Sequence, residues 1–328
     1  MKHSNETALT FDAPKKRVWT LPQIILSAII VLVSLSCLLP FVNMLAISLS
    51  SKSAILRGDV GFWPVELEFT AYKAIFADTS MIRSLFFTVG ITVAYTALAM
   101  VMTVLMAYPL TKQRLRGRKF FSFLALFTMY FSGGTIPIYL NIKSLGLLDT
   151  PWSLILPGML STYNMIILRS FFAALPKELE EAACIDGAND FQVLLQMYLP
   201  LSMASIATMT LFYAVGKWNS FQDALYYIST KAYQPLQLKL YHIIKGSQAV
   251  DVAAMEGGSS AVASSVSESI EPATIIFATL PILVVYPFVQ RYFVSGVTIG
   301  AIKGVAVQSP IALCRQVAVN IIKGVCSS

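Results

Sequence analysis

Few residues of this chain could do chemistry, and their spacing suits binding better than catalysis. Asp186 and Asp190 lie about one helical turn apart, a separation at which two carboxylates could share acid–base work. Capping of a helix start explains both acids more simply. The sequence holds no G-x-x-x-x-G-K-[ST] phosphate loop, so the chain is not expected to hydrolyse a nucleotide itself. We predict no catalytic residue.

The cysteines and histidines do not form a recognisable ligand set. Cys37 lies in an apolar run, Cys184 in a charged stretch, and Cys314 and Cys326 near the end of the sequence. Their spacing supports neither a disulfide framework nor a zinc site. The two histidines, at positions 3 and 242, are too far apart to form a motif. We therefore expect no metal site and no cofactor bound by this chain.

Lys217 is the main ionisable residue near an apolar segment, and such residues call for a functional hypothesis. Its neighbours Trp218 and Asn219 add an aromatic plane and an amide, which suit the ring faces and hydroxyls of a sugar. The simpler explanation is a lysine that snorkels to the outer surface beside an interfacial aromatic belt. Similar candidates for a substrate path, for which core packing is the simpler role of each alone, are Tyr130, Tyr139, Asn141, Tyr163 and Asn164.

The composition places these residues in a membrane protein. Of 328 residues, 56% are hydrophobic and 12% charged, and the mean hydropathy is +0.68. A soluble domain does not combine so much apolar with so little charged sequence. The net charge of +7 sits in short segments between apolar runs. It therefore reports membrane topology and not a nucleic-acid-binding face.

Six apolar runs are long enough to span a bilayer, and the chain is predicted to be an all-α membrane protein with six transmembrane helices. The runs cover residues 21–49, with a kink at Pro40, and then 84–110, 120–142, 152–172, 200–222 and 272–294. The small residues around Gly133 and Gly134 are expected to allow close helix packing in the third span. Segments 50–83 and 223–271 are predicted to be loops, the second mobile from Gly246 onward because it is rich in Ser, Ala and Gly.

The distribution of Lys and Arg predicts the orientation. Basic residues without matching acids occur in 1–20, in the segment 112–119 and after Arg291. These parts, and so both termini, are predicted to be cytoplasmic, while 50–83 and 223–271 face outward. The segment 176–200 also falls inside although it is acidic. Its acids are therefore expected to meet a basic partner surface.

The segment Pro176–Pro200 organises the others, because it is the one long charged element between two very apolar runs. Pro176 suits the first position of a helix, and the acids that follow suit the positive end of its dipole. Gly187 permits a left-handed turn that ends this helix. Asn189 or Asp190 can then cap a second helix. The segment is predicted to be a short helix–turn–helix that projects from the membrane.

This segment resembles the EAA loop of ABC-importer permeases. The matching positions are Glu181-Ala182-Ala183, Asp186-Gly187 and Leu199-Pro200, with Met197 where Ile is usual. Segments 48–64, 130–140, 216–219 and 286–304 resemble carbohydrate permeases of the maltose-transporter type, especially the branch for complex oligosaccharides. The resemblance covers residues 20–304.

The resemblance implies a type I ABC-importer permease fold over 21–304 in a bacterial cytoplasmic membrane, surrounded by lipid. It implies a second, related permease subunit, two ATPase subunits that hold ATP and Mg, and an extracytoplasmic binding protein that delivers an oligosaccharide. No nucleic acid is involved. The positions expected to couple the permease to the ATPase are Glu181, Ala182, Ala183, Asp186 and Gly187. ATP binding would then drive alternating access by rigid-body motion.

Three alternatives remain open. The importer could carry another solute, such as a polyamine, a peptide or an anion, although the spans offer no fixed cluster of Arg or Lys for an anion. A secondary transporter would need membrane-embedded acids and usually an internal repeat, and neither is visible. A membrane scaffold would leave the EAA-like loop unexplained. The tail 305–328 departs from the family pattern and is either a contact to the ATPases or an extension without a role in transport.

Overall fold

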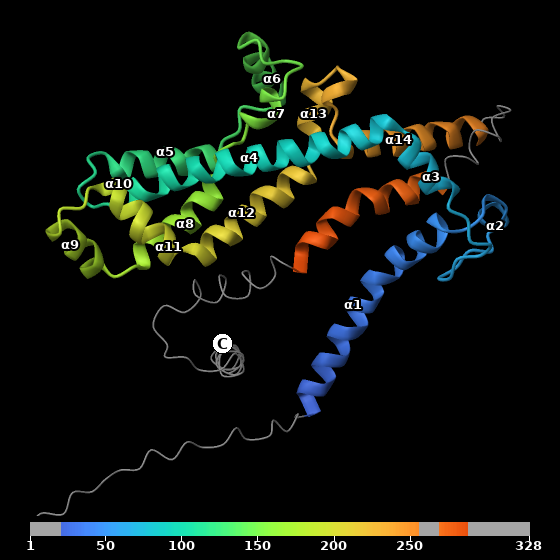
Figure 1. Ribbon diagram of the computed structural model, residues 1–328, viewed down its shortest axis with the longest axis horizontal. Helices are drawn as coiled ribbons and strands as arrows, with labels where there is room; N and C mark the ends of the chain where they lie inside the picture. The colour runs from blue at the N-terminus through green and yellow to red at the C-terminus, as the bar shows by residue number, and fades with distance from the viewer. Residues whose placement is uncertain (1–20, 256–268, 288–328) are drawn as a thin grey trace, which may run out of the picture.

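The computed structural model describes residues 21–255 and 269–287, and over these ranges the regular secondary structure is helical apart from an isolated antiparallel bridge between Ser50 and Leu67 (Figure 1). The all-α prediction is confirmed for this part. Four predicted features lie wholly or partly outside the described residues: the N-terminal segment 1–20, the stretch 256–268 of the outer loop, the end of the sixth span and the tail 305–328.

The central element is α4 (Thr79–Thr111), which runs along the long axis of the molecule (Figure 1). The side chain of Asp78 accepts a hydrogen bond from the Ser80 N–H at 2.8 Å and so caps its start. The helix packs against α8 (Thr162–Ala174) and α12 (Met203–Trp218). Its buried face carries small polar residues, which let neighbouring helices approach closely: Ser84, Thr88, Thr92, Thr96 and Thr103.

Three described helices are long and apolar enough to cross a membrane: α1 (Leu21–Ser48), α4 and the helix Ser269–Pro287. They match the predicted first, second and sixth spans. Two further pairs of helices pass the same test but are sharply bent. The described residues therefore contain three candidate spans, or five when each bent pair is one span.

The third predicted span, 120–142, is not one helix. It consists of α5 (Arg118–Tyr130) and α6 (Thr135–Ser144), which are bent by 114° relative to each other. Gly134 has φ +86° at the start of α6, a conformation that favours glycine. A Cβ added to Gly133 would meet no atom within 4 Å. The prediction that these glycines serve close packing was wrong, because they form a bend.

The fourth and fifth predicted spans are also interrupted. Between α7 (Trp152–Ile155) and α8, Pro157 and Gly158 break the helix, and the Tyr95 hydroxyl donates to the freed Gly158 carbonyl at 2.8 Å. The predicted start of the fifth span falls in a bend of 83° at Ser202. Before this bend lie α10 (Asp190–Val193), a π-helical turn η1 (Leu194–Tyr198) and α11 (Leu199–Leu201).

Both predicted outer loops contain helices. Segment 50–83 holds α2 (Lys52–Arg57) and α3 (Thr70–Ala77). Segment 223–271 holds most of α13 (Gln222–Tyr227), the 3-10 turn η2 (Lys231–Tyr233) and α14 (Leu236–Met255). The helix α14 continues beyond Gly246, where a mobile segment was predicted, so that prediction fails up to Met255. The Leu236 N–H donates to the Thr88 hydroxyl at 2.8 Å and ties α14 to α4.

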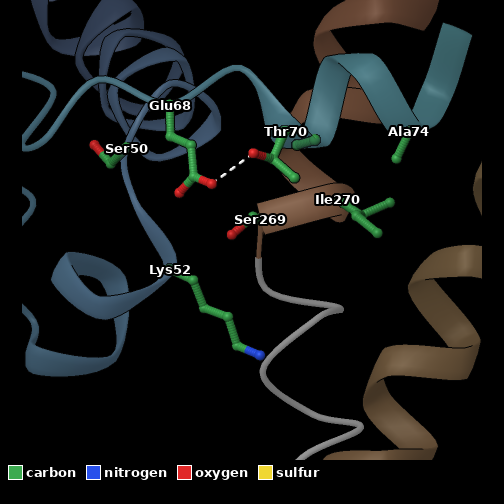
Figure 2. A pocket seen from close by; sticks show the side chains of 8 residues that line it. Ser50, Lys52, Glu68, Thr70, Ala74, Ser269 and Ile270 are labelled. Atoms are coloured by element: carbon green, nitrogen blue, oxygen red, sulfur yellow. Dashed lines mark hydrogen bonds between the residues drawn. The ribbon is translucent and has the colours of Figure 1, made fainter.

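The end of the molecule that contains α2 and α3 carries a small pocket of about 210 Å³, far from α9 (Lys177–Ile185) (Figure 1). Figure 2 shows Glu68 and Thr70 pointing toward each other across it, with Ser269 of the last described helix close by. Lys52 and Ser50 complete its polar lining. The pocket and α9 thus lie at opposite ends of the molecule.

Candidate functional site

The candidate site is the helix–turn–helix between α8 and α12, and its predicted turn is present. Helix α9 (Lys177–Ile185) follows Pro176 and begins with Glu178 and Glu180 in its first turn. Gly187 has φ +83°, the left-handed conformation expected of it. Its N–H donates to the Cys184 carbonyl at 3.1 Å, which ends α9.

Asn189, and not Asp190, caps the second helix. Its side chain accepts from the Gln192 N–H at 2.9 Å, and the Gln192 side chain accepts from the Asn189 N–H at the same distance. This reciprocal pair is a capping box. It fixes the direction in which the chain leaves α9 and enters α10.

A buried lysine joins α9 to the end of α4. The Lys112 ammonium lies 2.7 Å from a Glu180 carboxylate oxygen, and only 9% of the lysine side chain is exposed. It sits over the rings of Tyr108 and Tyr198, 4.2 and 4.4 Å from their centroids. The Tyr198 hydroxyl donates to the other Glu180 oxygen at 2.8 Å. We call Lys112, Glu180, Tyr108 and Tyr198 the lysine cage.

The lysine cage shifts the titration of its acid. Burial by itself would raise the pKa of the Glu180 carboxyl. The hydrogen bonds from Lys112 and Tyr198, together with the positive charges of Lys112 and Arg114, outweigh burial and hold this pKa below its ordinary value. Glu180 is therefore ionised at neutral pH and keeps Lys112 paired.

A second ion pair joins the same two segments, between Arg114 and Asp190. Both side chains are more than half exposed, so this pair contributes less than the buried one. The prediction that the acids of segment 176–200 serve a partner surface is thus wrong for Glu180 and Asp190. They bind basic residues of segment 112–119 in the same chain.

The predicted coupling residues lie on the outer side of this anchored helix. Glu181, Ala182, Asp186 and Gly187 are exposed, while Ala183 is half-buried against the core. Beside them Ile185 is 86% exposed, an unusual state for a large aliphatic side chain. One face of α9 is fixed to the end of α4, and the other presents acidic and apolar groups to a binding partner. This arrangement is suited to passing a movement of the partner on to α4.

Lys217 does not snorkel, contrary to the simpler explanation of its position. Only 7% of its side chain is exposed, and its ammonium lies 3.3 Å from the Asp223 carboxylate. It also sits 4.9 Å from the centroid of the Tyr95 ring. Trp218 turns the other way, and its indole N–H donates to the Ala278 carbonyl at 3.2 Å. The two neighbours therefore do not form one binding surface.

The other predicted path residues are distributed and not gathered. Tyr130, at the end of α5, is 84% exposed, and Tyr163 is 56% exposed. Asn164 is buried, while Asn141 and Asn219 are exposed, the latter ending α12. The Tyr139 ring stacks on Tyr227, with centroids 6.2 Å apart.

Sequence reasoning missed the lysine cage. The signal that could have found it is the joint prediction that segments 112–119 and 176–200 lie on the same side of the membrane. One segment is basic and the other acidic, so ion pairs within the chain were as compatible with the sequence as ion pairs to a partner. The tyrosines gave no such signal, since Tyr108 lies in an apolar run and Tyr198 lies among the apolar residues at the end of segment 176–200.

The fold and the exposed face of α9 can now be compared with known proteins. The model of the family of binding-protein-dependent transport system inner membrane components matches residues 15–249. The chain belongs to this family, which confirms the resemblance carried by the EAA-like loop. It is accordingly a component of a membrane transport system that works with a solute-binding protein.

Individual relatives agree with this membership. The chain is 41% identical over 273 residues to the polygalacturonan/rhamnogalacturonan transport system permease protein YtcP of Bacillus subtilis, covering 83% of this chain and 94% of YtcP. It is 43% identical over 267 residues to protein LplC of the same organism, covering 81% and 90%.

A solved structure agrees as well. The chain is similar to one in the crystal structure of a bacterial ABC transporter involved in the import of the acidic polysaccharide alginate. The TM-score is 0.75 at 31% identity, with 85% of this chain and all of that one covered.

Proposed function

We propose that this chain is a permease subunit of an ATP-driven importer for oligosaccharides, in which α9 transmits ATPase closure to the membrane helices. The observation that carries the proposal is the anchored coupling helix. Lys112 fixes Glu180 on one side of α9, while Glu181, Ala182 and Ile185 are presented on the other. A rigid element with one free face suits the transmission of motion between two subunits.

The proposal assigns the remaining components to partners. A second related permease completes the translocation path, and two ATPase subunits hold ATP and Mg and carry out hydrolysis. This chain is then a non-catalytic subunit in a bacterial cytoplasmic membrane. The solute-binding protein would bind at the end of the molecule that carries α2 and α3, where Glu68, Thr70 and Lys52 are among the residues that line the pocket of Figure 2.

The proposed topology has six spans with both termini in the cytoplasm. The pairs Lys112–Glu180 and Arg114–Asp190 support it, because they hold segments 112–119 and 176–200 at the same end of the molecule. Basic segments remain on the cytoplasmic side during insertion. In this topology α5 with α6, and α10–α11 with α12, count as two bent spans, and α8 contributes the fourth.

The cargo class rests on the relatives. YtcP is named for polygalacturonan and rhamnogalacturonan, and the structural neighbour imports alginate. We therefore place acidic oligosaccharides first among the candidates. Polyamines, peptides and simple anions are the alternatives that the same assay distinguishes.

The test is the ATPase rate of the reconstituted importer with its binding protein and a panel of acidic and neutral oligosaccharides. Glu181→Lys reverses a charge on the free face of α9, and Gly187→Asp strains the turn at φ +83°. We expect each to lower the sugar-stimulated rate about tenfold, the loss expected when a coupling free energy of about 1.4 kcal/mol is removed. Lys119→Glu is the control, because it reverses an exposed charge that lies outside α9 and the turn at Gly187, and it should leave the rate unchanged.

Two results would count against the proposal. Stimulation of both α9 variants to the wild-type rate would remove the coupling role. Stimulation by a polyamine or a peptide, and by no oligosaccharide, would leave the importer class in place and overturn the cargo.

A further inference from the structure

A groove of about 430 Å³ opens beside the lysine cage, between the end of α4, the basic segment that follows it and the start of α10. Its lining contains both apolar and polar residues. The apolar lining consists of Leu105, Pro109, Leu115, Phe191 and Leu194, and the polar lining of Tyr108, Lys112, Arg114, Arg116 and Asp190.

The polar lining of the groove keeps a positive charge after its internal pairs are formed. Lys112 is neutralised by Glu180, and Arg114 by Asp190. Arg116 is exposed and has no ion-pair partner among the described residues. Arg114 uses only one of its guanidinium nitrogens in its pair, so further donors remain for a ligand.

A buried hydroxyl at the groove lacks an acceptor. Tyr108 is 6% exposed and belongs to the core around Leu168 and Phe172. Its hydroxyl is buried and has no hydrogen-bond partner among the described residues. Buried polar groups are almost always paired in native proteins, so this one calls for an explanation. Because Tyr108 lines the groove, a small movement of its ring would let an anionic oxygen there accept the hydrogen bond.

The apolar residues of the groove are not matched by a ligand that is polar throughout. Leu105 is 48% exposed on a membrane-spanning helix, and Phe191 is 60% exposed on α10. A small inorganic anion would bind Arg116 and Tyr108 but would leave these apolar residues uncovered. The ligand that matches the whole lining has a phosphate next to a hydrocarbon chain.

We propose that this groove binds an anionic phospholipid. Its phosphate lies at Arg116, Arg114 and the Tyr108 hydroxyl, and an acyl chain lies along Leu105 and Phe191. Basic pockets beside membrane helices are suited to anionic lipid headgroups. The bound lipid bridges the basic segment and α10, next to Lys112, and so stabilises the support of the coupling helix. In the proposed topology this lipid belongs to the cytoplasmic leaflet.

The test measures lipid retention by the intact importer complex without ATP or sugar, so that it is independent of the transport proposal. The complex is purified in a neutral detergent and titrated with phosphatidylglycerol or phosphatidylcholine, and bound lipid is counted by native mass spectrometry. Arg116→Gln removes the free charge, and Tyr108→Phe removes only the hydroxyl and keeps the ring over Lys112. Lys119→Gln is the matched control, because it removes a charge of the same segment that does not line the groove.

We expect phosphatidylglycerol to bind more tightly than phosphatidylcholine. Arg116→Gln should weaken its binding about fivefold, the effect of one basic residue near a membrane surface. Tyr108→Phe should also weaken it about fivefold, the net effect of one hydrogen bond. Lys119→Gln should change the affinity less than twofold, a small shift for a charge outside the groove. Equal losses for Arg116→Gln and Lys119→Gln would show diffuse attraction and overturn the site. Equal retention of the two lipids, or displacement of the lipid by millimolar inorganic phosphate, would overturn it as well.

Discussion

Lys112 and Lys217 are both buried, yet they are enclosed differently. Lys112, after α4, lies 2.7 Å from Glu180 and stands over two tyrosine rings. Lys217, near the end of α12, lies 3.3 Å from Asp223 and 4.9 Å from the centroid of one ring. The Glu180 side chain is 24% exposed and that of Asp223 is 38% exposed. The first ion pair is therefore closer and its acid is less exposed, although the two lysines are buried to a similar degree.

The difference teaches what each lysine holds together. Asp223 follows Lys217 by only 6 positions, so their pair stiffens one corner between α12 and α13. Lys112 and Tyr198 are 86 positions apart, and Glu180 comes from α9. The lysine cage thus joins α9, the end of α4 and the turn η1. Loss of the lysine cage should therefore impair transport. Loss of the Lys217–Asp223 pair should affect only the corner between α12 and α13.

The largest effect is expected from Lys112→Met, which keeps the length of the side chain and removes its charge. Glu180 and Tyr198 then lose their common partner, and breaking a largely buried ion pair costs about 3 kcal/mol. Hydrogen exchange should show faster exchange in α9, and the sugar-stimulated ATPase rate should fall. Lys119→Met serves as the control for charge and should keep both properties. Unchanged exchange in α9 would show that the cage does not anchor it.

A smaller effect is expected from Lys217→Met. Asp223 is exposed enough to be hydrated once its partner is lost, so the apparent free energy of unfolding should fall by about 1 kcal/mol. Thermal unfolding of the complex in detergent measures this, and exchange in α9 should stay at the wild-type level. A loss as large as that of Lys112→Met would remove the contrast between the two lysines.

The smallest effect is expected from mild acid. The pKa of Glu180 is lowered from its ordinary value of 4.5, so its contribution to stability is complete above that value and is lost as pH falls through the lowered pKa. The difference in unfolding midpoint between wild type and Glu180→Gln should be constant from about pH 8 to about pH 5.5 and shrink below pH 4.5. A difference that shrinks near pH 6.5 would mean that another group controls the cage.

Sequence reasoning reached the features that depend on neighbouring residues. The turn at Gly187 and a cap at Asn189 follow from local backbone and side-chain chemistry, and both are present. The spans at α1 and α4 follow from uninterrupted apolar runs. The family itself was indicated by the residues around Glu181.

Hydropathy averages did not locate the breaks within apolar runs. The glycines at 133 and 134 and the pair Pro157-Gly158 lie inside sequences that remain apolar, so a composition window passes over them. Their bends depend on backbone conformation, and at Gly158 on a hydrogen bond from Tyr95. The lysine cage was missed for a related reason, since it depends on which distant segments meet.

Helix α1 stands apart from the remainder of the described chain (Figure 1), and none of its most apolar 18-residue window is buried there. Its last turns are attached through the Asn43 amide to Gly61 and the Ser48 hydroxyl to Tyr72. In hydrocarbon an apolar helix gains little by leaving lipid for protein, so insertion and docking can be separate events. It follows that α1 can enter the bilayer before it makes these contacts with the segment that comes after it.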